Sequence, residues 1–150
     1  DWSGKKLMEG KAQIIADNSY LGSVSLDLPV IGDTLVLSLG ANPNVLCSRT
    51  LSHKDSKASF LSRKKVVSTW VLAVENFQSD TISVDLIDAI PYPRSNDGDI
   101  EVFVEVSDGG RIDLLNHQVI FPLMLAPNER RQVSVVISVT YPRNKQLKGL

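Results

Sequence analysis

The residue types that could bind a metal or perform catalysis are few and far apart in this sequence. The two histidines, His53 and His117, have no second histidine or cysteine at the spacing of a zinc site, and we interpret both as solvated surface residues. The one cysteine, Cys47, lies in a strand-like run, which favours a small buried side chain over a reactive thiol. There is no Gly-x-Ser-x-Gly element and no glycine-rich phosphate loop. The sequence therefore predicts no catalytic, metal or cofactor site.

Carboxylates form a second group of candidates. The run Asn96-Asp97-Gly98-Asp99 resembles the oxygen-rich start of a calcium loop, but no glutamate follows at the closing position, and turn chemistry accounts for these residues. Asp88 and Pro91 stand in an Asp-x-x-Pro arrangement at a strand end. We expect the Asp88 carboxylate to accept backbone N–H bonds from the following turn, which is a structural role.

Cations gather in the longest polar stretch, residues 53–65, which we interpret as a loop. Its basic residues are Lys54, Lys57, Arg63, Lys64 and Lys65. Long loops on rigid sandwiches often carry recognition, so this stretch is the predicted interaction surface. The alternative is a solvated face that protects a strand edge, since lysines deter edge-to-edge pairing.

The elements that must position these residues are strands. Apolar and polar residues alternate with a period of two along most of the chain, and turn residues separate the runs. The expected strands are residues 11–16, 20–26, 34–39, 45–51, 66–76, 81–87, 100–106, 119–125 and 132–141. Nine short strands at hairpin spacing predict an all-β, antiparallel β-sandwich, immunoglobulin-like in general architecture.

The expected core is drawn from alternate residues of four of these strands. Trp70 is the predicted anchor, because a large ring can fill the gap between two sheets. The other core candidates are Leu72, Val74, Ile82, Val84, Leu86, Val102, Val104, Val133, Val135 and Ile137. Asn76 is expected to form hydrogen bonds at a turn.

Composition limits the kinds of partner and the cellular compartments that can be expected for this chain. The formal net charge of the 150 residues is −1, so no basic field recruits nucleic acid. No apolar run reaches the roughly 20 residues of a membrane-spanning helix. A single cysteine leaves cytosol, cell envelope and secretion all open. We expect one domain, with residues 1–40 as a small β subunit if a seam lies near residues 40–43.

Eight segments together resemble the C-terminal domain of the mucoidy inhibitor A (MuiA)-like family, a domain of unknown function. The segments are YLG at 20–22, LVLSLG at 35–40, NVLCSR at 44–49, VEN at 74–76, VDLIDAIP at 84–91, DIEV at 99–102, LAPNE at 125–129 and VTYP at 139–142. Asn76, Asp88, Pro91, Tyr141 and Pro142 are the structural residues within them. The resemblance implies the C-terminal part of a longer chain and assigns no catalytic residue. Where many relatives have a tryptophan, this chain has VIF at 119–121, and Phe121 can fill the same kind of core position.

The function expected from these observations is a noncatalytic interaction or scaffolding module that binds a protein partner or self-associates. A carbohydrate-binding module is the alternative, and it would need an exposed aromatic platform. The residues available for one are Trp2, Tyr20, Tyr92 and Tyr141. A hydrolase with a dispersed site is a third hypothesis, and it would need a pocket with convergent titratable groups.

Overall fold

The computed structural model describes residues 9–16, 19–26, 38, 40–59, 62–93, 98–107 and 109–145. These residues form nine strands and no helix, and none of their segments is a helix long and apolar enough to cross a membrane. The strands are β1 (Gly10–Ala16), β2 (Ser19–Leu26), β3 (Val45–Ser59), β4 (Arg63–Asn76), β5 (Ile82–Ala89), β6 (Glu101–Val106), β7 (Arg111–Asp113), β8 (Gln118–Leu125) and β9 (Arg130–Pro142).

The chain forms two compact units, Asp1–Pro43 and Asn44–Leu150. In the first unit, β1 and β2 pair as an antiparallel hairpin with a bulge between Ile14 and Ile15. Half-buried and exposed residues alternate from Lys11 to Ile15 and from Leu21 to Leu26, as the period-two pattern predicted. Apart from Ser38, the strand predicted at 34–39 lies outside the described residues.

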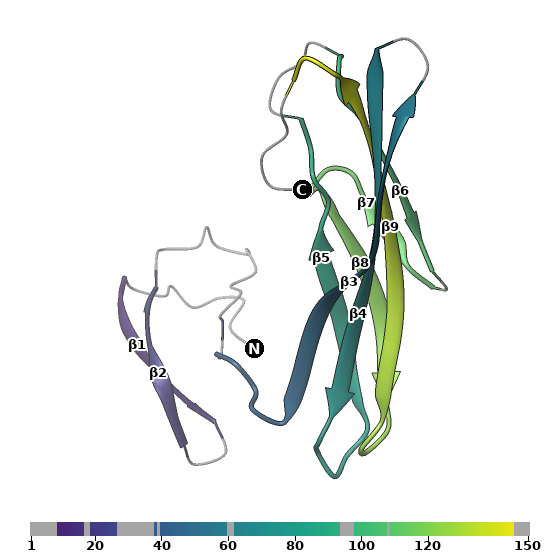
Figure 1. Ribbon diagram of the computed structural model, residues 1–150. Coiled ribbons are helices and arrows are strands. Elements are labelled where there is room, and N and C mark those ends of the chain that lie inside the picture. The colour runs from purple at the N-terminus through teal and green to yellow at the C-terminus, as the bar shows by residue number, and fades with distance from the viewer. Residues whose placement is uncertain are drawn as a thin grey trace. The chain divides into compact units, whose positions relative to one another are not determined.

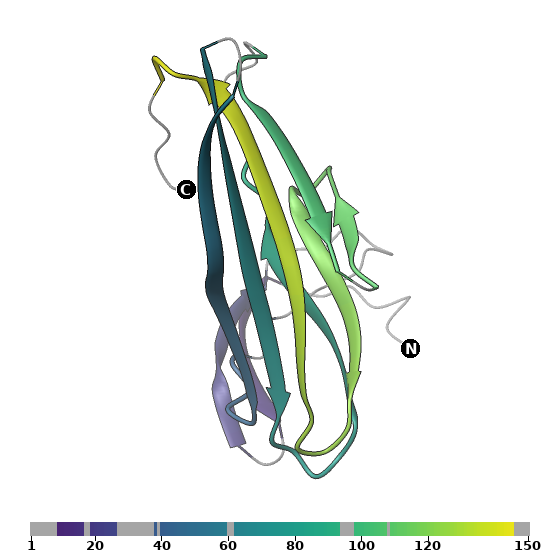
Figure 2. The ribbon, with the colours of Figure 1, turned by 45° about the vertical axis from the view of Figure 1, so that its right-hand side comes forward.

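The second unit is a sandwich of two antiparallel sheets (Figures 1 and 2). The first sheet has the order β3-β4-β9-β6 and the second has the order β5-β8-β7. A constant-type immunoglobulin domain also divides seven strands into four and three. The strand order differs, because the last strand, β9, lies between β4 and β6, where the fifth strand lies in an immunoglobulin domain.

The core lies between the two sheets and includes the centre of the predicted set. Five predicted residues are buried: Leu72, Val74, Val133, Val135 and Ile137. Trp70, Leu86, Val102 and Val104 are partly buried and pack against them. Removing each large apolar side chain from water contributes about 1.5–3 kcal/mol to folding, which the sheets gain only by facing each other.

Strand β8 supplies a larger part of the core than the pattern indicated. Val119, Phe121 and Leu125 are each 0% exposed, and Phe121 occupies the buried position that the sequence allowed for it. The sequence did not predict β7, which is only three residues long and pairs with β8 no further than Ile120. Among the described strands, Pro122 therefore pairs with β5 on one side and has no neighbour on the other. Its missing N–H lies on the unpaired side and removes no hydrogen bond between strands.

Candidate functional site

Strand β3 forms an edge of the four-stranded sheet, and among the described strands it pairs with β4 alone. The amide of Phe77 donates to the carbonyl oxygen of Asn44 (2.8 Å), so the backbone groups of Asn44 point toward β4. Backbone groups of successive residues in an antiparallel strand point to opposite sides. Counting from Asn44, the residues whose backbone groups point away from β4 are Val45, Cys47, Arg49 and Leu51. The sheet therefore ends in a row of outward-facing donors and acceptors.

This open edge, residues 45–51, has a block at each end. Pro43 precedes it and has no N–H to donate. A bulge follows it, because the β3–β4 register shifts between Leu51 and His53. Cys47 within the edge is exposed, so the prediction of a buried cysteine is wrong. The reason is that an edge strand leaves one side of its side chains uncovered.

In the polar stretch 53–65, residues 53–59 and 63–65 are strand residues and not a loop, which corrects the prediction. Lys54 and Lys57 belong to β3, and Arg63, Lys64 and Lys65 belong to β4. The two strands stay in register, with Lys57 opposite Lys65. Both strands continue past the bulge as a long charged hairpin, in which β3 lies at the sheet edge and β4 pairs with β9 on its other side. Polar composition indicated a loop, but a strand whose side chains are exposed needs few apolar residues.

Part of this charge is paired. Nη2 of Arg63 lies 3.1 Å from Oε1 of Glu101 and also donates to the carbonyl oxygen of Asp99 (3.1 Å). Nζ of Lys145 lies 2.9 Å from Oδ2 of Asp99. An open depression of about 480 Å³ adjoins these groups, lined by Ser62, Arg63, Asp99, Pro142, Arg143 and Asn144. These pairs hold the end of the charged hairpin against β6 and the C-terminal end of β9.

Trp70 and Asp88 come together through a residue that the sequence analysis did not select. The guanidinium carbon of Arg49 lies 3.5 Å from the ring centroid of Trp70, and Nε of Arg49 donates to Oδ2 of Asp88 (2.9 Å). Asp88 was expected to accept bonds from the backbone of the following turn. Its carboxylate instead accepts this bond from the other sheet.

Asn76 is fully buried where two loops meet. Its Nδ2 donates to the carbonyl oxygens of Asp80 (2.9 Å), Leu125 (3.2 Å) and Ala126 (3.1 Å). Its Oδ1 accepts from the amide of Gln78 (2.9 Å). The side chain thus ties the β4–β5 loop to the end of β8.

The other structural residues lie at the sandwich ends. Half-buried Pro91 follows Ile90, whose amide donates to the carbonyl oxygen of His117 (2.7 Å). Tyr141 is partly buried and packs against the core. Pro142 ends β9 opposite Arg63, and its carbonyl oxygen accepts from the amide of Lys145 (3.1 Å). Each therefore marks a point where the chain leaves a sheet.

The candidate aromatic platform is divided. Tyr92 stacks on His117 with ring centroids 4.2 Å apart, which covers one face of its ring. Tyr141 is packed against the core, Tyr20 belongs to the first unit, and Trp2 lies outside the described residues. Of these candidates, the described part of the second unit therefore presents Tyr92 and a partly buried Tyr141.

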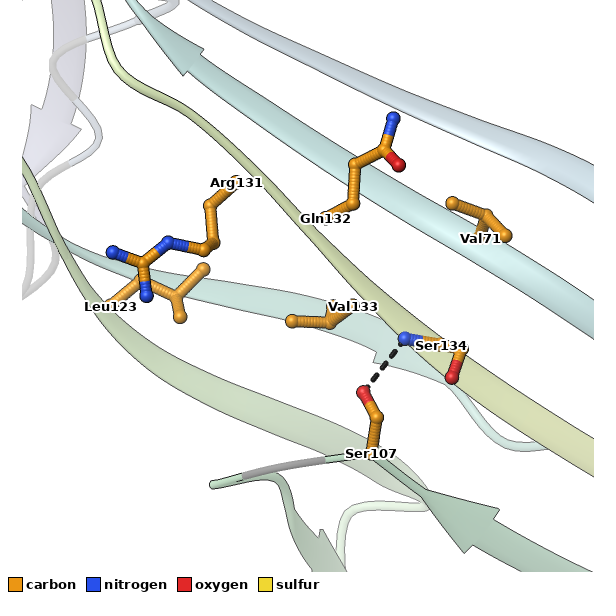
Figure 3. A pocket seen from close by; sticks show the side chains of 7 residues that line it. All are labelled: Val71, Ser107, Leu123, Arg131, Gln132, Val133 and Ser134. Carbon is orange, nitrogen blue, oxygen red and sulfur yellow. Dashed lines mark hydrogen bonds between the residues drawn. The ribbon is translucent and has the colours of Figure 1, made fainter.

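A shallow depression of about 340 Å³ lies beside the first residues of β9 (Figure 3). Its lining residues are Val71, Ser107, Leu123, Arg131, Gln132, Val133 and Ser134. The amide of Ser134 donates to Oγ of Ser107 (2.8 Å), at the point where β6 leaves β9. The one charged lining group, Arg131, pairs with Glu129. The depression therefore has no charged lining group that lacks a protein partner.

Two carboxylates with displaced pKa values both serve turns. The side chain of Asn116 lowers the pKa of Asp113, helped by backbone N–H bonds from Asn116 and Leu115. The amide of Ala126 and the guanidinium of Arg131 lower the pKa of Glu129. Among the described residues, no three histidine, cysteine or acidic side chains gather as metal ligands, and Asp97 of the calcium-like turn lies outside that part.

Comparison with known families adds one finding. A family model described as Domain of unknown function (DUF4139) matches residues 5–143, which is most of the chain. The chain belongs to this family. No curated protein and no solved structure matches it. The function of this DUF4139 domain must therefore be argued from its own geometry.

Within this DUF4139 domain, sequence reasoning missed Arg49 and the open edge of β3. The signal for Arg49 was a lone cation among the apolar and small residues of 45–51. Such an inward-facing charge is one of the devices that mark edge strands. Its partner Asp88 lies 39 residues away, and only the packing of the two sheets brings them together.

Proposed function

We propose that this domain is a noncatalytic interaction module of a MuiA-like protein, and that it binds a partner's extended segment along the open edge of β3. The observation that carries the proposal is the outward-facing row of backbone groups at Val45, Cys47, Arg49 and Leu51. An added strand satisfies such a row with main-chain hydrogen bonds, while alternate side chains give specificity. Exposed Leu46, at 59%, and Leu51, at 41%, would gain burial in the same step.

The MuiA-like assignment is supported by the eight matching segments, two of which cover the open edge and the strand that contains Asp88. A C-terminal module of a longer chain would act by holding that chain to another protein. Catalysis is not part of the proposal, because the displaced pKa values belong to turn carboxylates and not to groups that converge on a pocket.

The charged hairpin end has a separate part in this proposal. Lys54, Lys57, Arg63, Lys64 and Lys65 lie beyond the bulge, and lysines and bulges both discourage strand addition. Exposed cations such as Lys54, Lys64 and Lys65 instead attract acidic surfaces and raise association rates more than affinity. We therefore propose that this end steers an acidic surface of the partner, while the open edge forms the lasting contacts.

Photocrosslinking in the full-length protein in its native cells tests the edge. A benzophenone amino acid replaces Leu46 on the open edge, and in a matched variant it replaces Met124, which is 68% exposed on β8. We expect discrete protein adducts from position 46 and none of the same mass from position 124. Equal adducts at both positions would show that capture reflects exposure alone, which contradicts the proposal.

A proline pair tests whether backbone pairing is responsible. Cys47→Pro removes an outward-facing N–H and leaves the β3–β4 hydrogen bonds intact, whereas Ser48→Pro removes an N–H that points toward β4. With the crosslinker at position 46, we expect Cys47→Pro to abolish the adducts while the domain stays folded. Ser48→Pro should lower the free energy of unfolding. Undiminished adducts in folded Cys47→Pro would overturn the proposal.

A further inference from the structure

We infer that the open depression of about 480 Å³ beside the end of the charged hairpin binds a carboxylate group, which Arg63 and Arg143 hold. The other residues that line it are Ser62, Asp99, Pro142 and Asn144. The inference rests on the proposed function, because it gives the partner's acidic surface one point of attachment at this end. The carboxylate is the side chain of an aspartate or glutamate of that partner.

Backbone contacts place the two arginines on neighbouring strand ends. Arg63 begins β4 and lies opposite Pro142, the last residue of β9. The amide of Arg143 donates to the carbonyl oxygen of Ser62 (2.9 Å), the residue just before Arg63. This bond joins the start of β4 to the end of β9. Each of the two strand ends therefore contributes one arginine to the same depression.

The guanidinium of Arg63 has a donor that the protein does not use. Its Nη2 lies 3.1 Å from Oε1 of Glu101 and donates to the carbonyl oxygen of Asp99 (3.1 Å). Its Nε is buried and has no hydrogen-bond partner among the described residues. A buried donor without an acceptor is costly, and a guanidinium presents its donors as a fork that matches a carboxylate. A ligand carboxylate that accepts from Nε and Nη2 together would give this N–H its acceptor.

Arg143 supplies a cation that is exposed and forms no ion pair with the described residues. The carboxylate in the lining, Asp99, is already paired with Nζ of Lys145 (2.9 Å). The described charges of the lining and of its ion-pair partners are thus three cations and two carboxylates, which leaves one positive charge. One positive charge attracts a carboxylate, and a phosphate dianion would exceed it.

Glu101 occupies part of the place that the ligand would take. Its carboxylate contacts Arg63 as an incoming one would, and its side chain is 65% exposed. Exposed ion pairs contribute little stability, because water screens them, so Glu101 can move away at small cost. Arg63 can then turn toward the ligand and offer Nε together with Nη2. We therefore expect weak, salt-dependent binding that becomes tighter when Glu101 is removed.

An NMR titration of the purified 150-residue chain with sodium acetate tests the site, and sodium chloride at equal ionic strength is the reference. Acetate is the probe because it is a carboxylate with almost nothing attached. We expect saturable shifts at Nε–H of Arg63 and at the backbone amides of Arg143 and Asn144. Shifts that do not saturate, or that chloride reproduces, would overturn the inference.

Two pairs of variants separate the site from a general effect of charge. Arg143→Gln should weaken acetate binding about tenfold, because a charge-assisted hydrogen bond is lost. Lys64→Gln removes the same charge from an exposed residue outside the lining and should change the affinity by less than about twofold. Glu101→Gln should bind acetate severalfold more tightly, whereas Glu105→Gln on the same strand should not. Equal effects within either pair would contradict the inference.

A blocked tripeptide with one glutamate between two glycines tests whether the carboxylate belongs to a protein. We expect this peptide to shift the same signals as acetate, and the glutamine version to leave them unchanged. Acetate binding without peptide binding would indicate a free organic acid and overturn the assignment to the partner. Neither probe touches the open edge of β3. Failure of both titrations would therefore leave the adducts from position 46, and the edge contact they test, unaffected.

Discussion

Arg49 on β3 and Asp88 on β5 connect the two sheets of the sandwich through one hydrogen bond of 2.9 Å. The Arg49 guanidinium also lies over the Trp70 ring, with its central carbon 3.5 Å from the ring centroid. A planar cation can stack on an aromatic face and donate from its edge at the same time. The open edge of β3 is thus fixed to the core at its middle, close to the residues that we expect to bind a partner.

Arg49→Lys should lower the free energy of unfolding by about 1–2 kcal/mol, because an ammonium cannot both stack and donate from Nε. The effect is moderate, since the Arg49 side chain is 41% exposed and water screens part of the pair. Urea unfolding measures it. Lys54→Gln on the same strand is the matched control, with an expected change within about 0.5 kcal/mol. A double-mutant cycle with Asp88→Asn should show coupling, and strict additivity would contradict the connection.

The sequence analysis succeeded where local pattern decides structure. The alternation in residues 66–76 and 132–141 predicted β4 and β9 and their inward-facing core residues, because a half-buried strand must alternate. It failed where pairing decides structure. Residues 53–59 are a strand because β4 continues beside them, and their polar composition reads as a loop. β7 has three residues, which is too short for a period to be visible.

The candidate site was less predictable than the fold. Trp70 and Asp88 could be selected one at a time, but their link through Arg49 depends on how two sheets pack, which no spacing reveals. The open edge of β3 is visible only once the neighbours of every strand are known. Cys47 was mispredicted for the same reason, because a strand-like run does not show whether its strand is central or at an edge.

Asn76→Ala should lower the free energy of unfolding by roughly 3–5 kcal/mol, because it leaves buried backbone groups without partners and each costs about 1–3 kcal/mol. Asn76→Asp keeps the shape but replaces the Nδ2 donor with an acceptor that faces three carbonyl oxygens. It should destabilise by a similar amount. Chemical denaturation of both variants decides the point, and a near-neutral Asn76→Asp would show that shape rather than donation matters.

Gly110→Ala should destabilise the domain by about 1–3 kcal/mol through overpacking. A Cβ at Gly110 would clash with Cε1 of Phe121, a ring that is 0% exposed, so the ring or the backbone would have to shift. Gly109→Ala is not a suitable control, because its φ of 73° is strained for any side chain. Phe121→Leu is the better comparison. In the Phe121→Leu background, Gly110→Ala should lower the free energy of unfolding by less than it does in the native chain. Equal reductions would rule out the contact as the cause.

Glu129→Gln should lose stability at neutral pH and little in acid. The amide of Ala126 donates to Oε2 of Glu129 (2.8 Å) and Arg131 donates to Oε1, so the folded chain holds the pKa of Glu129 below its ordinary 4.5. A lowered pKa in the folded state means that the ionised form stabilises folding above pH 4.5. That contribution falls as the pH drops through the folded pKa.

The gap in unfolding free energy between the native chain and Glu129→Gln should therefore be widest near pH 7 and narrow as the pH falls below 4.5 and through the lowered pKa of the folded chain. Urea titrations at a series of pH values measure this gap. Arg131→Met removes the second group that lowers the pKa of Glu129 and keeps the bond from Ala126. It should therefore narrow the gap without closing it. A gap that stays constant across the series would mean that Glu129 acts through packing, because packing has no proton to gain or lose.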